Sequence, residues 1–182
     1  MIQASTRIKT KEDDGMRRML SAAVMMCTIA LLSTLLTAVY ATPSEPVSGS
    51  FDYTFEITGM RGADGNTFLY ATEWEDWEGD FTGTSVAVFR VEMFRSGFWN
   101  VWLRSTFTGT VNGKSGTAVI QLVGKKSSGE DWYGQWVILS GTGDLANLRG
   151  QGTWWGPGYR SDTKIPGDPD IYYSGKIHFK PS

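Results

Sequence analysis

Apolar and polar residues alternate with a period of two along most of the chain after residue 50. In residues 51–58 every odd position is aromatic or aliphatic and every even position is polar, and residues 171–180 alternate in a similar way. Strict alternation of this kind is typical of β-strands that bury one face and expose the other. These two segments are therefore predicted to be strands.

Six further segments bring the predicted number of strands to eight. They cover residues 67–74, 81–94, 98–111, 116–126, 132–140 and 150–155. Asn112-Gly113 lies between two of them and is a strong hairpin signal, because both residues tolerate a positive φ. Asp64-Gly65 indicates a similar turn.

The alternation also predicts which side chains point inward. In residues 98–111 the inward set is Trp99, Val101, Leu103, Ser105 and Phe107. In residues 81–94 it includes Phe81, Ala87, Phe89, Val91 and Met93. Arg90 and Glu92 should then lie on the outer face.

Eight strands without a convincing amphipathic helix predict an all-β fold, either a sandwich or an antiparallel β-barrel. An eight-stranded up-and-down sheet can close on itself, which removes exposed edges. Its interior is then filled by side chains or holds one small ligand.

Two glycine-rich motifs carry a resemblance to a known family. Thr108–Thr117 has the spacing of a G-x-x-x-G-x-x-G-[ST] hairpin, and Ser140–Gly152 is similar to an SGTGeLagLrGeG signature. Together they resemble a family of small uncharacterised bacterial proteins with the allene oxide cyclase barrel, which is akin to lipocalin-like barrels. The resemblance implies an eight-stranded antiparallel barrel. It assigns no catalytic residue, because the glycines serve turns and close backbone contacts.

The N-terminal segment has the composition of an export signal. Met16-Arg17-Arg18 precedes an uncharged, apolar run, and Ala38–Ala41 supplies small residues for cleavage. We expect a signal peptide over 1–41 (with Met16 as an alternative start), a linker over 42–48 and a barrel domain over 49–182. An uncleaved anchor formed by residues 19–41 is the alternative. Both place the domain outside the cytoplasm, secreted or on the membrane.

Charge and residue counts exclude several kinds of chemistry. Residues 1–41 hold five of the 17 basic and three of the 19 acidic residues, so the domain has a net charge of −4, which argues against nucleic acid as a partner. Cys27 is the only cysteine and lies in the signal segment. His178 is the only histidine and is expected at the surface. No metal site and no cofactor are expected.

The candidate ligand-binding residues come from the eight tryptophans and one loop. Residues 73–80 interleave carboxylates with Trp74 and Trp77, and the expectation is a solvated loop whose tryptophans cover one barrel end. Sugar binding, calcium binding and glycoside hydrolysis are the alternatives there. Trp154 and Trp155 are adjacent and face opposite sides, so at least one should be exposed, near Tyr159 in the long loop 156–170.

Three functional hypotheses follow. The first is non-enzymatic: the domain binds a small apolar or amphipathic ligand, or serves as a structural extracytoplasmic module. The second is an isomerase or cyclase acting on a hydrophobic substrate, which rests on the resemblance in fold alone. The third is a carbohydrate-binding module built on exposed tryptophans.

Overall fold

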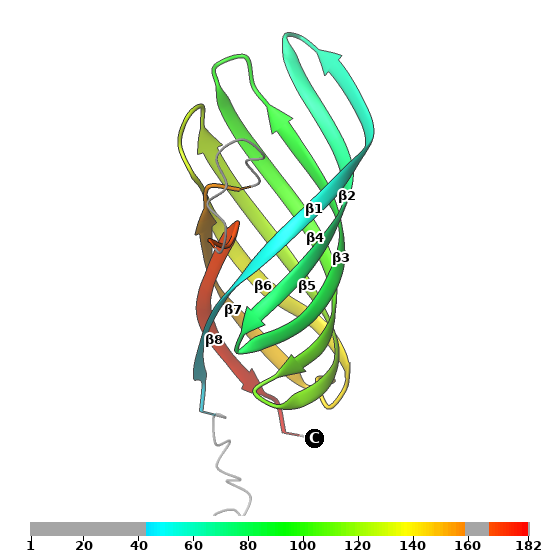
Figure 1. Ribbon diagram of the computed structural model, residues 1–182, viewed down its shortest axis with the longest axis vertical. Helices are drawn as coiled ribbons and strands as arrows, with labels where there is room; N and C mark the ends of the chain where they lie inside the picture. The colour runs from blue at the N-terminus through cyan, green and yellow to red at the C-terminus, as the bar shows by residue number, and fades with distance from the viewer. Residues whose placement is uncertain (1–42, 159–167, 182) are drawn as a thin grey trace, which may run out of the picture. The chain divides into compact units, whose positions relative to one another are not determined.

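The computed structural model describes residues 43–158 and 168–181, which form eight strands and no helix (Figure 1). The strands are β1 (Glu45–Ala63), β2 (Asn66–Gly79), β3 (Phe81–Met93), β4 (Phe98–Val111), β5 (Lys114–Ser127), β6 (Trp132–Gly143), β7 (Leu148–Gly156) and β8 (Ile171–Phe179). Each strand pairs antiparallel with the next, and β1 also pairs with β8, so the sheet closes into a barrel-like ring. The all-β, eight-stranded antiparallel architecture is confirmed.

The ring closes through the start of β1. Residues 45–51 pair with β8 in a register that runs from Glu45 opposite Ile177 to Phe51 opposite Ile171. β1 therefore begins at Glu45, inside the segment 42–48 that the sequence suggested as a linker. Residues 1–41, which contain the expected signal or anchor, lie outside the described residues, and no helix that could span a membrane occurs in the described ones.

The acidic segment 73–80 corrects one expectation. It is not a loop, because β2 continues through it to Gly79 and pairs there with both neighbouring strands. Its odd positions continue the inward-facing series that starts at Ala71, and its even positions face outward. The apolar–polar alternation is interrupted here, because two of the inward positions, Glu73 and Glu75, carry carboxyl groups.

The predicted turns and side-chain directions are confirmed elsewhere. Asp64 and Gly65 have φ values of 52° and 77°, and Asn112 and Gly113 have 49° and 78°. Two successive positive φ angles define the type I′ turn that suits a two-residue hairpin. In β3 and β4 the inward sets are the expected ones, and on the outer face Arg90 pairs with Glu92 at 2.9 Å.

One half of the interior is filled by aromatic rings, and we call it the packed half. It lies toward the end at which β2 joins β3, β4 joins β5 and β6 joins β7. The Phe81 ring is central there, with ring centroids 5.8 Å from Phe107, 5.4 Å from Tyr173 and 6.0 Å from Trp136. Leu145, in the turn between β6 and β7, is fully buried against the same cluster.

Buried polar atoms in the packed half bond to the backbone. The Tyr173 hydroxyl accepts a hydrogen bond from the Phe81 amide at 2.9 Å and donates to the Glu78 carbonyl at 3.3 Å. Burial raises the pKa of Tyr173 to about 12. The Trp136 indole donates to the Ser174 carbonyl at 3.1 Å. These bonds fix the orientation of large rings that could otherwise pack in several ways.

Candidate functional site

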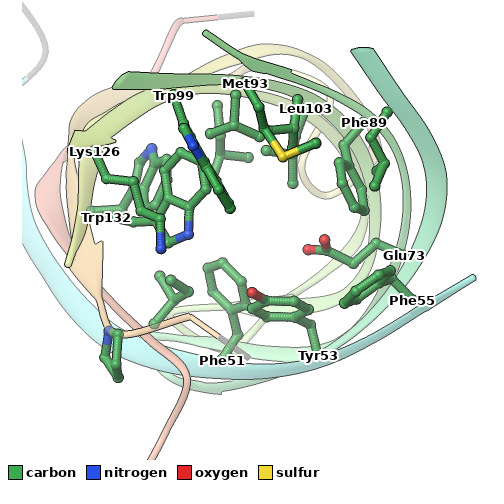
Figure 2. A pocket seen from close by; sticks show the side chains of 17 residues that line it. Phe51, Tyr53, Phe55, Glu73, Phe89, Met93, Trp99, Leu103, Lys126 and Trp132 are labelled. Atoms are coloured by element: carbon green, nitrogen blue, oxygen red, sulfur yellow. The ribbon is translucent and has the colours of Figure 1, made fainter. Parts of the chain in front are cut away.

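The other half of the interior contains a cavity of about 230 Å³ that is partly open to solvent (Figure 2). It lies toward the end at which β3 joins β4 and β5 joins β6. Seven aromatic side chains belong to its wall: Phe51, Tyr53, Phe55, Phe89, Trp99, Trp132 and Trp154. Aliphatic side chains such as Val101 and Leu103 complete it. A dry apolar cavity of about 150 Å³ is large enough to hold benzene, so this one has room for a ring with a short substituent.

Glu73 is the acidic group in this apolar wall. It comes from β2, is 4% exposed, and directs its carboxyl group into the cavity (Figure 2). Burial raises the pKa of Glu73 well above its ordinary value. The charge of Glu75, a hydrogen bond with Glu75 and the charge of Asp170 raise it further. Such a shift favours the protonated form, because an uncompensated charge is costly in an apolar environment.

A buried polar layer lies between the cavity and the packed half on the wall formed by β2, β3 and β4. It consists of Glu75, Trp77, Ser85 and Ser105, all of which point inward from β2, β3 and β4. Glu75 Oε2 accepts hydrogen bonds from Trp77 Nε1 at 3.0 Å, from Ser105 Oγ at 2.7 Å and from Ser85 Oγ. Three donors converging on one oxygen hold this carboxyl group in a fixed position.

Glu73 and Glu75 interact through a side-chain hydrogen bond. Glu75 Oε1 is buried and meets no N–H or hydroxyl donor of Ser, Thr or Tyr among the described residues. A protonated Glu73 changes this, because its hydroxyl can donate to Glu75. Adjacent carboxyl groups commonly share one proton in this way.

Lys126 brings a positive charge to the other side of the cavity. Its ammonium group lies over the rings of Trp99, at 4.8 Å from the centroid, and Trp132, at 5.2 Å. The two indoles are themselves 6.1 Å apart. Figure 2 shows Lys126 and Glu73 on opposite walls. The aromatic wall therefore already accommodates one ammonium group, through cation–π contacts.

Asp170 joins the start of β8 to β1 beside the cavity. Its side chain accepts a hydrogen bond from the Tyr53 amide at 3.1 Å, and its own amide donates to Asp52 Oδ1 at 3.0 Å. It is 2% exposed. These bonds hold this part of β1, with its aromatic residues, close to the place where β1 pairs with β8.

The four suggested residues that the structure describes, Trp74, Trp77, Trp154 and Trp155, lie in different parts of the domain. Trp154 lines the cavity, and its indole donates to the Val123 and Gln135 carbonyls, both at 3.2 Å. Trp77 belongs to the polar layer. Trp74 and Trp155 lie on the outer face, each 45% exposed, so the expectation that at least one of Trp154 and Trp155 is exposed is confirmed. Tyr159 lies outside the described residues.

The exposed tryptophans of the described strands also lie apart. Trp74 pairs across the sheet with Thr54 and Val86, and Trp102 pairs with Arg90 and Val123. Trp155 pairs with Tyr133 and Tyr172. No two of the three are cross-strand partners, and a flat row of adjacent indoles is not formed by them.

Sequence reasoning missed Glu73 as the polar group of an internal site. The sequence contained a signal for it, since Glu73 and Glu75 occupy odd-numbered positions, as do the apolar residues Leu69, Ala71 and Trp77. Five acidic residues in eight positions are more typical of a solvated segment, and this composition made the alternation of inward and outward positions hard to recognise.

Similarity to known proteins agrees with the fold and adds no activity. No curated protein matches the chain. A crystal structure of a protein of unknown function from the DUF3224 family of Shewanella oneidensis MR-1 is similar, with a TM-score of 0.62 and 18% identity over 77% of this chain and 100% of that chain. Likeness at this identity concerns the fold alone. Residues 47–155 match the family model DUF3224, described as a protein of unknown function. The chain thus belongs to the DUF3224 family.

Proposed function

We propose that this domain is a non-enzymatic binding protein that holds one small apolar or amphipathic ligand inside the strand ring. The supporting observation is the partly open cavity of about 230 Å³, walled by seven aromatic side chains on strands that are hydrogen-bonded on both sides. Concave, mostly apolar sites with a few polar groups are the usual form of small-molecule sites.

The size of the cavity sets the expected affinity. A ligand with about nine non-hydrogen atoms, such as propylbenzene, corresponds to a ring with a short chain. Small ligands of this kind gain at most about 1.5 kcal/mol per atom and usually much less, so we expect a Kd between about 10 μM and 1 mM. Release of ordered water and burial of apolar surface drive the association.

The test is calorimetric titration with propylbenzene of the wild type and of two matched variants. Val101→Phe adds a ring at a cavity wall position that is 9% exposed, and it should abolish binding while the domain stays folded. Val88→Phe makes the same change on the outer face, at a position that is 56% exposed, and should leave binding unchanged. Equal binding by the wild type and Val101→Phe would place the ligand elsewhere and refute the proposal.

An isomerase or cyclase is the second candidate, and one observation favours it. Glu73 is a buried carboxyl group on the wall of an apolar cavity, and its raised pKa is the kind of property found in general acids. The test is chromatography, which separates isomers of equal mass, followed by mass spectrometry, applied to any molecule that co-purifies with Glu73→Gln before and after incubation with the wild type and with Glu73→Gln. Conversion to an isomer by the wild type alone would support catalysis, whereas an unchanged molecule in both would support simple binding.

We further propose that the domain works outside the cytoplasm, either after cleavage near Ala41 or tethered by residues 19–41. The support is the charge and apolar pattern of the N-terminal segment. Fractionation of cells expressing the full chain, with determination of the N-terminal residue of the recovered domain, tests both points. Recovery of the uncleaved chain from the cytoplasm would contradict them.

A further inference from the structure

We propose that the polar group of the ligand is a protonated amine, which pairs with Glu73 while the apolar part of the ligand lies among the aromatic rings. This inference rests on the proposed function and names the class of ligand for the same cavity. Its starting point is an imbalance of charge. Glu73 and Glu75 are 4% and 1% exposed, and no lysine or arginine of the described residues lies within ion-pair distance of either carboxyl group.

Buried carboxyl groups without a cationic partner are rare, because their desolvation is not repaid. Here a proton on Glu73 is the compensation, since it removes the charge of that carboxyl group and lets it donate a hydrogen bond to Glu75. An ammonium group can take the place of that proton. It supplies the positive charge, and it carries three N–H donors, which suit a carboxyl group that faces the cavity (Figure 2).

The aromatic wall supports the same class of ligand. Cations are attracted to the faces of aromatic rings, most strongly where water is excluded. Two rings of this wall, Trp99 and Trp132, already hold the ammonium group of Lys126 at 4.8 and 5.2 Å. On the opposite side, Phe55 and Phe89 meet edge to face at 5.7 Å, and both line the cavity. An amine bound to Glu73 would lie on the side of the cavity that lacks the lysine.

The affinity for an amine should depend on pH. At low pH the amine must displace the proton of Glu73, so binding strengthens as pH rises toward the pKa of Glu73 and then levels off while the amine stays protonated. The other titratable groups around Glu73 are Glu75, Asp170, Tyr53 and Lys126. β3 and β4 contribute only apolar side chains to the cavity wall. Among Glu73 and these neighbouring groups, only Glu73 presents a carboxyl group to the cavity.

The test uses three probes of nearly equal size: 2-phenylethylammonium, 2-phenylethanol and propylbenzene. Calorimetric titration of the wild type from about pH 5 to about pH 8 should show the ammonium probe binding at least about tenfold more tightly than propylbenzene at the upper end, with the ratio falling toward pH 5. Glu73→Gln should remove the preference and its pH dependence, and should leave propylbenzene binding intact. Glu92→Gln, the same change on the outer face, should keep both.

The outcomes separate the two proposals. If no probe binds, the proposed function is wrong and the inference falls with it. If propylbenzene binds as tightly as the ammonium probe, the proposed function stands and the inference is wrong. Tightest binding of 2-phenylethanol would also overturn the inference, in favour of a neutral hydrogen-bond donor. A preference for the ammonium probe that survives in Glu73→Gln would show that another group selects it.

Discussion

The packed half and the cavity half of the interior are built from the same kinds of residue, yet only one of them is filled. Glycines lie under a large indole in both halves: Gly152 and Gly175 under Trp136 in the packed half, and Gly124 and Gly134 under Trp154 beside the cavity. The end of the packed half is covered by Leu145 from the turn between β6 and β7. The cavity half has equally large rings, but they line a space that opens to solvent. The alternation of apolar and polar residues therefore predicts which side chains face the interior, and it does not predict whether those side chains fill it.

The polar layer lies on one side of the interior. Glu75, Trp77, Ser85 and Ser105 bond to one another on the neighbouring strands β2, β3 and β4, and their geometry is directional. Moving a ring into this part of the interior would leave buried polar atoms unpaired, which is costly.

The largest difference in stability between the two halves is expected when one aromatic ring is removed from each. Phe107→Ala, at a fully buried position in the packed half, should lower the free energy of unfolding by about 3–5 kcal/mol. Phe89→Ala should cost less, about 2 kcal/mol, because one side of that ring already faces the cavity. Urea unfolding monitored by circular dichroism measures both. Equal losses would mean that the cavity is collapsed in solution.

A glycine substitution tests how closely the packed half is packed around Trp136. A Cβ at Gly152 would collide with the Ser174 carbonyl oxygen and would lie 2.6 Å from Trp136 Nε1, so Gly152→Ala should displace both the neighbouring strand and the indole and cost about 1–3 kcal/mol. Gly113→Ala is the control, since no atom lies within 4 Å there and only the φ of 78° opposes alanine, at about 1 kcal/mol. Thermal unfolding compares the two. A smaller loss at Gly152 than at Gly113 would refute the close packing of Trp136.

The pH dependence of stability sharpens the role of Glu73. Its pKa is higher in the folded domain than its ordinary value of 4.5, so the folded state holds the proton more tightly than the unfolded chain. The contribution of Glu73 to the free energy of unfolding is fully present below about pH 4.5. It is lost as pH rises through the raised pKa, by up to about 1.4 kcal/mol per pH unit. Glu73→Gln should flatten this slope in urea titrations, and Glu92→Gln should not. An unchanged slope in Glu73→Gln would contradict a buried neutral acid.

The smallest effect is expected outside the ring. Trp155→Ala removes an indole that is 45% exposed and stacks on Tyr172 at a centroid distance of 5.9 Å. The loss of this pair should lower stability by about 0.5–1 kcal/mol. A loss comparable to that of Phe107→Ala, measured in the same urea series, would show that the outer face is buried against another surface.

The fold was largely predictable, because strand alternation and type I′ turns are local properties of the sequence. Asn112-Gly113 and the inward series of β4 illustrate this. The site was less predictable, because it depends on which end of the ring stays open and on contacts between distant strands. Ser105 joins Glu75 across 30 positions of sequence. Of the four suggested residues that the structure describes, Trp154 alone lines the cavity. The odd-numbered position of Glu73, in the same inward-facing series as Ala71 and Trp77, would have identified it as an inward-facing residue.

The seam between β1 and β8 has a consequence for folding kinetics. It joins Glu45 to Ile177 and ends where Phe51 meets Ile171, two residues that both line the cavity. Seven pairs in this seam connect positions more than 100 residues apart, and such contacts carry a large loop-closure entropy. All-β domains dominated by distant pairings fold in milliseconds to seconds. We therefore expect the cavity to form late, so that the onset of ligand binding in a stopped-flow refolding experiment reports the moment at which the two ends of the domain meet.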